Sequence, residues 1–575
     1  MLKLYKYLKP YTMPIVIVLV LVFLQTIANL YLPTLMADII DKGIMIGDTG
    51  NIMKTGGTML LFVAGGVAAS VVASYFSSRT ASGFGRDVRS RVFERVESFS
   101  LHEFDKLGTA TLITRTTNDI TQVQMVTVMM MNMMVSAPLM AIGGLIMALS
   151  KDVGLSWVLA VAVPVLLLTI VVLANKALPL FKSIQGKVDK INLIVRENLT
   201  GIRVIRAFNR IGREKERFEE ANSDLTDTFI KVNRMMAFMF PIMMIIMNLT
   251  SLAIMWFGAK RIDAGAMEMG ALAAFLQYAM QIMFSFLMLS MMFIMVPRAQ
   301  AAAVRINEVL ETEPEINDPQ LAKPAAGGRG RVEFRDVTFS YHGAEQPALS
   351  NISFTAEPGE IVSIIGGTGS GKSTLINLIP RFYDVDSGAV LVDGVDVRDI
   401  TQSELRGKIG FVPQKSVLFS GSIAENIRFG KEDATDTEIS DAAATAQATE
   451  FISQTEEGYE HMIAQGGTNV SGGQKQRLSI ARALVKKPEV YLFDDSFSAL
   501  DFKTDAKLRA ALKKQTADST VFIISQRVST VMDSDKIIVL DEGRIVGLGR
   551  HRDLVRTCSV YREIAASQLS EEQLA

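Results

Sequence analysis

The chain has 575 residues, enough for two or more domains with cores of their own, and 49% of them are hydrophobic. Its formal net charge of −1 gives no indication of a nucleic-acid partner, and its single cysteine excludes a disulfide within the chain and a cysteine-based metal cluster. The mean hydropathy of +0.27 is high for a soluble protein and predicts long apolar segments.

Six apolar stretches long enough to cross a bilayer occupy about the first 300 residues. They follow a short basic segment, residues 2–11, which we expect to lie as an amphipathic helix at the membrane surface. The first apolar run is too long for a signal-peptide core and lacks a small-residue cleavage pattern, so we expect it to stay on the mature protein. The predicted spans are, approximately, residues 13–40, 58–78, 125–149, 155–179, 235–259 and 270–297.

The connections between these stretches alternate between short and long. The short ones hold few basic residues, whereas the two long ones, residues 86–115 and 182–234, are rich in Lys and Arg. Basic residues mark the cytoplasmic side, so we expect a multi-pass protein of the cell membrane with both termini in the cytoplasm. Each long connection is helical in pattern and has a small-residue point, at residues 107–110 and 198–201, where we expect the chain to reverse and present a short helix.

Methionine is frequent inside the predicted spans, with a run at residues 129–131 as one example. These side chains fill space between helices or against lipid, or they line a pliable cavity that accepts varied apolar ligands. No acidic residue lies deep in a span, so nothing indicates a proton or metal-ion pathway. The candidate polar contacts in such a cavity are Asn132, Asn248, Gln277 and Gln281.

The composition changes after residue 305, where charged residues are followed by prolines and a glycine pair. We interpret residues 306–330 as a linker between a helical membrane domain, residues 1–305, and a second domain. Residues 331–575 alternate between short apolar runs and helical segments, which predicts an α/β fold.

A glycine-rich loop in the second domain has the context of a phosphate-binding loop. It follows the strand-like run at residues 361–365 and precedes a helical run at residues 375–379. Backbone N–H groups and the helix N-terminus would face the phosphates, Lys372 would reach the β- and γ-phosphates, and the Ser373 hydroxyl would bind Mg²⁺. The sequence therefore predicts a nucleotide site of ATP or GTP. The loop residues are Gly366, Gly367, Thr368, Gly369, Ser370, Gly371, Lys372, Ser373 and Thr374.

A second motif, residues 470–477, carries Ser471, Gly472, Gly473 and Gln474 at the start of a helical run. It resembles the signature of the ATP-binding cassette (ABC) transporter family, and the resemblance covers nearly the whole chain. Six spans fused to one cassette are similar to an exporter half-transporter: an all-α membrane domain followed by an α/β P-loop NTPase domain. In that family the signature closes over the nucleotide bound by the opposite cassette of a dimer.

The resemblance implies roles for further residues. Tyr341 matches the aromatic residue that stacks on adenine, and Gln414 matches the residue that touches Mg²⁺ and contacts the membrane domain. Asp494 matches the acidic partner of the Mg²⁺ shell, and Asp501 ends the loop that crosses the dimer interface. Residues 107–113 and 198–206 correspond to two coupling helices, the second of which sits in the partner's cassette in family exporters.

Two positions depart from the family pattern on the catalytic side of the nucleotide. Asp495 stands where the family has a glutamate that activates the attacking water, and Gln526 stands where it has a histidine that contacts the γ-phosphate. Loss of one methylene withdraws the carboxylate by roughly 1 Å, which spoils general-base geometry. Glutamine donates a hydrogen bond but carries no proton or charge near neutral pH. Gln465, before the signature, replaces a common glutamate as well.

These departures resemble one chain of a heterodimeric multidrug exporter with one degenerate and one competent ATP site. We therefore expect an ATP-driven exporter of lipophilic small molecules that hydrolyses ATP mainly at the partner-type site and needs a second half-transporter chain. The alternatives are a homodimeric lipid or peptide exporter in which Asp495 is a slow base, and an ATP-gated regulatory or channel subunit.

Overall fold

The computed structural model describes residues 1–324 and 329–570. The chain forms two compact units. The membrane unit comprises residues 1–97 and 110–312, and the nucleotide unit comprises residues 98–109 together with the chain from residue 313 onward. A short segment between the second and third spans therefore belongs to the nucleotide unit.

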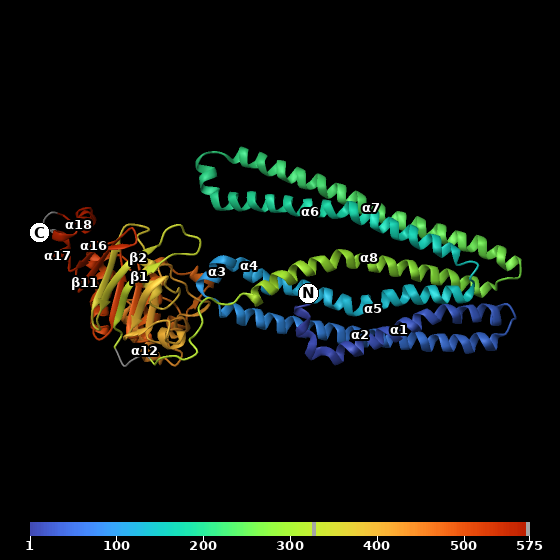
Figure 1. The fold of residues 1–575 in the computed structure, drawn as a ribbon, viewed down its shortest axis with the longest axis horizontal. Helices are drawn as coiled ribbons and strands as arrows, with labels where there is room; N and C mark the ends of the chain where they lie inside the picture. Colours follow the sequence, from blue (N-terminus) through green and yellow to red (C-terminus); the bar gives the residue numbers. More distant parts are fainter. Residues whose placement is uncertain (325–328, 571–575) are drawn as a thin grey trace. The chain divides into compact units, whose positions relative to one another are not determined.

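Long helices make up the membrane unit (Figure 1). Among the described residues, five helical segments are long and apolar enough to cross a membrane, and a further helix, α6, has a described apolar part at Trp157–Leu173. α1 packs along α2, α5 along α8, and α6 along α7. Helices suit this environment because lipid offers no hydrogen-bond partner to the backbone. The elements are η1 (Leu4–Tyr11), α1 (Thr12–Ile39), η2 (Ile40–Ile44), α2 (Thr49–Glu97), α4 (Thr109–Thr114), η3 (Arg115–Asp119), α5 (Ile120–Lys151), α6 (Trp157–Ala207), α7 (Ile211–Asp263) and α8 (Met269–Glu311).

The short helix of the first long connection is α3 (Leu101–Leu107), which ends where the predicted coupling helix begins. Ser100 caps its N-terminus in a capping box with Glu103. Gly108 ends it with a left-handed backbone, φ 75°. The predicted position, residues 107–113, is therefore wrong, because it runs across this helix break and into α4.

The second long connection contains no break at residues 198–201. α6 continues through them to Ala207, and the chain reverses at residues 208–210, where Asn209 has φ 51°. The Asn198 side chain donates to the carbonyl oxygen of Ile194, one turn earlier, at 3.0 Å. A single helical glycine, Gly201, costs only about 1 kcal/mol. The predicted reversal is wrong, and residues 198–206 are the last turns of α6.

The expected linker begins inside a helix. α8 extends to Glu311, so residues 306–311 are its last turns, with Ile306 and Val309 fully buried. Helix-favouring alanines precede this segment and Pro314 follows it, which explains why the helix ends only there. The linker residues 325–328 lie outside the described part of the chain.

Two sheets organise the nucleotide unit. The larger has the order β12-β11-β3-β10-β9-β6, and all its pairings are parallel except that of β11 with β12. The smaller is antiparallel, with the order β2-β1-β4-β5, and β7 pairs with β8 apart from both. The strands are β1 (Val332–Phe339), β2 (Leu349–Ala356), β3 (Ile361–Gly366), β4 (Ser387–Val392), β5 (Val395–Asp396), β6 (Ile409–Val412), β7 (Gly421–Ser422), β8 (Met462–Ile463), β9 (Val490–Asp494), β10 (Thr520–Ile524), β11 (Lys536–Asp541) and β12 (Arg544–Gly549).

The central strands of the larger sheet are buried on both faces, as parallel strands usually are. Their side chains contribute to two apolar core clusters, one of which includes the signature helix α14 and the other the phosphate-loop helix α9. The helical elements are α3, α9 (Lys372–Leu378), α10 (Gln402–Gly407), α11 (Ile423–Arg428), α12 (Asp436–Thr445), α13 (Thr449–Ile452), η4 (Gly458–Glu460), η5 (Gln465–Gly467), α14 (Gly472–Val485), α15 (Phe502–Gln515), α16 (Val528–Val531), α17 (His551–Thr557) and α18 (Ser559–Ala566).

Candidate nucleotide site

Three neighbouring parallel strands end at one edge of the larger sheet. β3 ends at Gly366, β9 at Asp494 and β10 at Ile524, and β10 pairs with both of the others. The backbone N–H of Asp495 donates to the carbonyl oxygen of Ile524 at 3.1 Å. Ligands of open α/β sheets bind outside the carboxyl ends of the strands. The fold thus brings the phosphate loop, the acidic pair and Gln526 to the edge where a ligand binds.

Glycine is required in the phosphate loop by geometry. Gly369 and Gly371 have left-handed backbones, with φ 82° and 94°. A Cβ atom on Gly371 would lie 2.8 Å from the carbonyl oxygen of Ala348, and one on Gly366 would collide with the carbonyl oxygen of Leu540. The loop backbone is therefore free of side chains where it turns into α9.

Lys372 and Ser370 place buried polar groups in this loop. The Lys372 ammonium donates to the carbonyl oxygens of Gly366 and Gly367 at 3.0 and 2.7 Å, and burial lowers its pKa, although the carboxylates of Asp494 and Asp495 oppose that shift. The Ser370 hydroxyl is buried and has no hydrogen-bond partner among the described residues. The Ser370 hydroxyl would gain a partner from an anion in the loop, because an unpaired buried polar group is costly.

The Ser373 hydroxyl donates to Asp494 Oδ1 at 2.9 Å. Burial raises the pKa of Asp494, and the hydrogen bond from Ser373 opposes that rise. A hydroxyl beside a carboxylate supplies oxygen ligands for Mg²⁺, which keeps several waters and binds through one or two carboxylates plus substrate phosphates. Ser373 and Asp494 therefore fit the ion that the sequence predicts.

Asp495 and Gln526 follow β9 and β10. Asp495 is half-buried with φ 44°, and burial raises its pKa while the Lys372 charge opposes the rise. The Gln526 side chain is exposed, and the backbone carbonyl oxygen of this residue accepts a hydrogen bond from the Gln568 side chain at 2.8 Å. The loop after β10 is thus held through its backbone, and among the described residues no hydrogen bond engages the Gln526 side chain.

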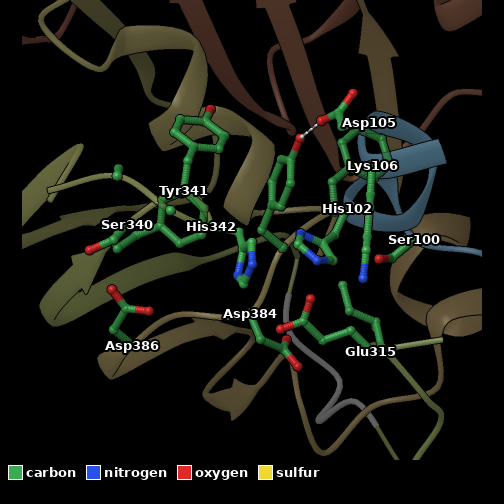
Figure 2. Close-up of a pocket in the computed structure, with 16 residues that line it drawn as sticks. Ser100, His102, Asp105, Lys106, Glu315, Ser340, Tyr341, His342, Asp384 and Asp386 are labelled. Atoms are coloured by element: carbon green, nitrogen blue, oxygen red, sulfur yellow. Dashed lines mark hydrogen bonds between the residues drawn. The ribbon is translucent and has the colours of Figure 1, made fainter. Parts of the chain in front are cut away.

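Tyr341 lies beside the phosphate-loop helix. Its hydroxyl is 3.0 Å from the hydroxyl of Thr374, and its ring meets the ring of Tyr383 at 85° with 5.5 Å between centroids. The Tyr383 hydroxyl donates to Asp105 on α3 at 3.4 Å, the dashed line in Figure 2, and burial, with help from Asp105, raises its pKa to about 12. The exposed fraction of Tyr341 is 39%, which leaves ring surface for a base to stack on.

A cavity of about 590 Å³ lies next to these tyrosines, entirely within the nucleotide unit. Figure 2 shows the imidazoles of His102, on α3, and His342, directly after Tyr341, next to each other in it, with ring centroids 4.9 Å apart and ring planes at 76°. The loop that holds Tyr341 is therefore packed directly against α3.

The signature residues lie at the N-terminus of α14. Ser471 and Gln474 form a capping box, in which the Gln474 side chain accepts from the Ser471 N–H at 2.8 Å. A Cβ atom on Gly473 would lie 3.3 Å from the carbonyl oxygen of Ala499. Gly472 is exposed. Among the described residues, no hydrogen bond joins this helix start to the phosphate loop.

Asp501 and Gln414 lie at the ends of different elements, α15 and β6. Asp501 is the N-cap of α15 and accepts from the N–H groups of Lys503 and Thr504 at 3.1 and 2.9 Å, which lowers its pKa. Gln414, after β6, is exposed. One chain therefore assembles the phosphate loop, the acidic pair and Tyr341, but not the signature.

Comparison with known proteins decides the family. The model of the ABC transporter transmembrane region matches residues 15–286, and that of the ABC transporter matches residues 349–498. An uncharacterized ABC transporter ATP-binding protein of Mycobacterium tuberculosis is 44% identical over 98% of this chain and 97% of its own length. The chain belongs to the ABC transporter family.

Further similarities agree with that family. The ABC transporter ATP-binding protein YfiB of Bacillus subtilis is 39% identical over 98% of both chains. The structure of a bacterial Atm1-family ABC exporter with ATP bound superimposes with a TM-score of 0.81 at 26% identity, covering 97% of this chain and 98% of that one. The exporter half-transporter fold predicted from the sequence is confirmed.

As an ABC transporter, the chain is an ATP-hydrolysing membrane protein. Sequence reasoning did not find Tyr383, Asp105, His102 or His342. No local sequence pattern connects these residues, because residues 102 and 105 lie more than 200 positions from residues 342 and 383. Only the packing of α3 on the nucleotide unit brings them together.

Proposed function

We propose that this ABC transporter exports lipophilic small molecules as one half of a heterodimer, with its own ATP site hydrolysing slowly. The observation that carries the proposal is the pair Asp495 and Gln526 at the edge where the phosphate loop, β9 and β10 meet. The ATP-holding groups beside them, Lys372, Ser373 and Asp494, are all present.

Slow ATP hydrolysis at this site is expected from the length of the aspartate side chain. Aspartate places its carboxylate roughly 1 Å nearer its own backbone than glutamate, and a misplaced general base costs about 10²–10⁴-fold in rate. The left-handed backbone of Asp495 is fixed by its hydrogen bond to Ile524, so the main chain does not advance to compensate. Gln526 adds no charge near the γ-phosphate. ATP binding is retained while turnover falls.

The signature residues are the reason to propose a partner chain. Ser471–Gln474 form an intact helix N-terminus whose dipole favours a phosphate, yet within the chain it has no hydrogen bond to the phosphate loop among the described residues. We assign it to the competent ATP site of a second half-transporter. Ser373 and Asp494 would hold Mg²⁺, with Gln414 as a further candidate ligand, and the ion would supply positive charge against the phosphates.

The cargo assignment rests on the apolar, methionine-rich spans and on relatives whose names state a cargo. A Mycobacterium tuberculosis relative at 32% identity is named a fatty acid transporter. A Bacillus subtilis relative at 31% is provisionally named a multidrug export protein, and a Syntrophus aciditrophicus relative at 30% is named a lipid A-core flippase. Their shared chemistry is lipophilic. In this chain, closure of the two cassettes on ATP would be passed to the spans by α3 and the α6–α7 turn, with both termini in the cytoplasm.

The test is the Mg-ATPase activity of the purified chain in lipid, beside Asp495→Glu, Gln526→His and the double variant. We expect the native chain to be near-silent and the double variant to reach about 1–10³ s⁻¹. Ordinary turnover by the native chain alone would show that Asp495 is a working base and would remove the case for a heterodimer. Binding of ATP in the presence of EDTA is the control, and should be equal in all four proteins.

Export has a separate test. The partner subunit is first identified by co-purification with the chain from native membranes. Cells that produce both chains should then lose a lipophilic dye faster when energised. Energy-dependent accumulation of the dye would contradict export.

A further inference from the structure

The side chain of Gln568, two residues beyond α18, holds the loop after β10 at two points. The Val528 N–H donates to Oε1 of Gln568 at 2.8 Å, and Nε2 of Gln568 donates to the backbone carbonyl oxygen of Gln526 at 2.8 Å. One planar amide carries both an acceptor and donors, so it can pair with an N–H group and a carbonyl oxygen at once. We call these two hydrogen bonds the Gln568 clamp.

The clamp supplies a partner that the loop lacks locally. Val528 is the first residue of α16, and its N–H is one of those that have no partner inside the helix. The N-cap residue, Arg527, makes no side-chain cap, because a guanidinium has donors and no acceptor. Val528 is fully buried, where an unpaired N–H is costly. Gln568 therefore caps α16 from 40 residues away.

The chain end is anchored independently of this amide. Tyr561 and Ala565 of α18 are fully buried in an apolar cluster that also contains Val528, and Leu569 packs against it (Figure 1). The N–H groups of Gln568 and Leu569 both donate to the carbonyl oxygen of Ala565, at 3.0 and 2.9 Å. Gln568 itself is exposed. A substitution at Gln568 therefore removes the clamp without opening the core.

Arg527, between the two clamped residues, joins the loop to the segment after β9. Its guanidinium donates to the carbonyl oxygens of Ser498 and Leu500 at 3.0 and 3.4 Å. The hydroxyl of Ser498 donates in turn to the backbone carbonyl oxygen of Asp495 at 2.8 Å. A displacement of residues 526–528 would therefore be passed to the segment that follows the acidic pair.

We propose that Gln568 is a positioning residue of the ATP site. The clamp fixes residues 526–528, and through them the Gln526 side chain and the contacts of Arg527 beside Asp495. Gln568 acts through this loop and not by contact with the nucleotide, so release of the chain end slows ATP turnover and leaves ATP binding intact. The place of Gln526 at the γ-phosphate rests on the proposed function, whereas the contacts of Arg527 do not.

Hydrogen–deuterium exchange of the purified full chain in lipid tests the clamp without any turnover. In Gln568→Ala the Val528 N–H should exchange about tenfold faster, which corresponds to the loss of one hydrogen bond of ordinary strength. Residues 498–501 should also exchange faster, because Arg527 holds two of their carbonyl oxygens. Gln568→Glu keeps the acceptor for Val528 but cannot donate to the carbonyl oxygen of Gln526, so its effect should be smaller.

Mg-ATPase activity separates positioning from binding. It is measured for the native chain and for the Asp495→Glu/Gln526→His variant, each with and without Gln568→Ala. In whichever of these two backgrounds turns over, we expect kcat to fall about tenfold and KM for ATP to change by less than about twofold. Gln568→Glu should retain more of kcat than Gln568→Ala.

Glu563→Ala is the matched control. Glu563 is exposed on α18, and among the described residues no hydrogen bond joins its side chain to the loop after β10. Its substitution should leave kcat, KM and exchange at Val528 unchanged. The midpoint of thermal unfolding should be nearly the same in Gln568→Ala, Glu563→Ala and the native chain.

The inference is overturned if Gln568→Ala leaves exchange at Val528 unchanged, or speeds exchange while kcat stays the same. Parallel losses of kcat, ATP affinity and thermal stability would also overturn it, because Gln568 would then serve the fold and not the site. Turnover by the native chain alone would remove the case for a heterodimer, and the comparison at Gln568 would then be made in the native chain. If neither background turns over, exchange at residues 498–501 decides, and no change there overturns the inference.

Discussion

The hydroxyl of Ser373 and Oδ1 of Asp494 are 2.9 Å apart, although 121 residues separate them in the chain. The bond links the first turn of α9 to the end of β9. We predict that Asp494→Asn removes the gain in ATP affinity that Mg²⁺ gives and leaves Mg-free nucleotide binding within about twofold, because the amide keeps the shape and loses the charge that an ion needs. Calorimetric titration with ATP, in Mg²⁺ and in EDTA, measures both. Equal affinity gains from Mg²⁺ in the variant and the native chain would contradict this role of Asp494.

Two glycines of the phosphate loop should respond differently to alanine. At Gly371, φ is 94° and a Cβ would lie 2.8 Å from the Ala348 carbonyl oxygen, so Gly371→Ala should both destabilise the nucleotide unit, by about 1–3 kcal/mol, and abolish ATP binding. At Gly367 nothing lies within 4 Å, so Gly367→Ala should leave stability within about 0.5 kcal/mol and weaken only ATP binding. Denaturation and binding of a fluorescent ATP analogue are the measurements. Equal losses of stability would contradict the difference in geometry.

The acidic pair should give a pH-dependent stability. Burial raises the pKa of Asp495 above its ordinary value of 3.8. Its favourable contribution is therefore present below pH 3.8 and is lost as the pH rises through the raised pKa. Asp495→Asn should stabilise the nucleotide-free chain at pH 7, because the amide does not carry the charge that burial disfavours. The gain should shrink as the pH falls towards 4.

Asp501 serves as a control, because its pKa is shifted in the opposite direction to that of Asp495. Hydrogen bonds from the backbone and side chain of Thr504 lower its pKa, so its stabilising contribution is present above pH 3.8 and is lost as the pH falls through the lowered value. Asp501→Asn should lower the midpoint of thermal unfolding at pH 7, and the two variants should converge in acid. A shift of the same sign in both variants would contradict the assignment.

The contact of Tyr383 with Tyr341 should support adenine binding. Tyr383→Phe keeps the ring and loses only the hydrogen bond to Asp105, so ATP affinity should change by less than about twofold. Tyr383→Ala removes an aromatic pair worth about 0.5–1.5 kcal/mol, so ATP affinity should fall by about 2–10-fold. GTP and ATP titrations of both variants provide the measurement. An equal effect of the two substitutions would place the function in the hydroxyl, not in the ring.

Much of the architecture can be predicted from short segments of the sequence. The six spans are predicted because an apolar run of about 20 residues has few alternatives to crossing a bilayer. The strand, glycine loop and helix around Lys372 are likewise contiguous in sequence, so their order alone predicts a phosphate site. Ser471 before Gln474 is a local capping pattern, and the structure has that capping box.

Helix boundaries in the long connections were harder to predict. The pattern at residues 198–201 indicated a break, but the Asn198 side chain bonds inside the helix and α6 continues. In the first connection, both Gly108 and the small residues beside it were candidates for a turn. The left-handed backbone of Gly108, and the packing of α3 on the nucleotide unit, decided the boundary.

The sequence by itself determined the family, the phosphate loop, and the departures at Asp495 and Gln526, because these depend on residue identity within short segments. Only the tertiary structure decided that Asp494 meets Ser373 and that Tyr383 joins Tyr341 to Asp105. Such contacts join residues that are far apart in the chain or lie on separate helices. Sheet order and helix packing set them, and both are determined by burial of the whole domain and not by any local pattern.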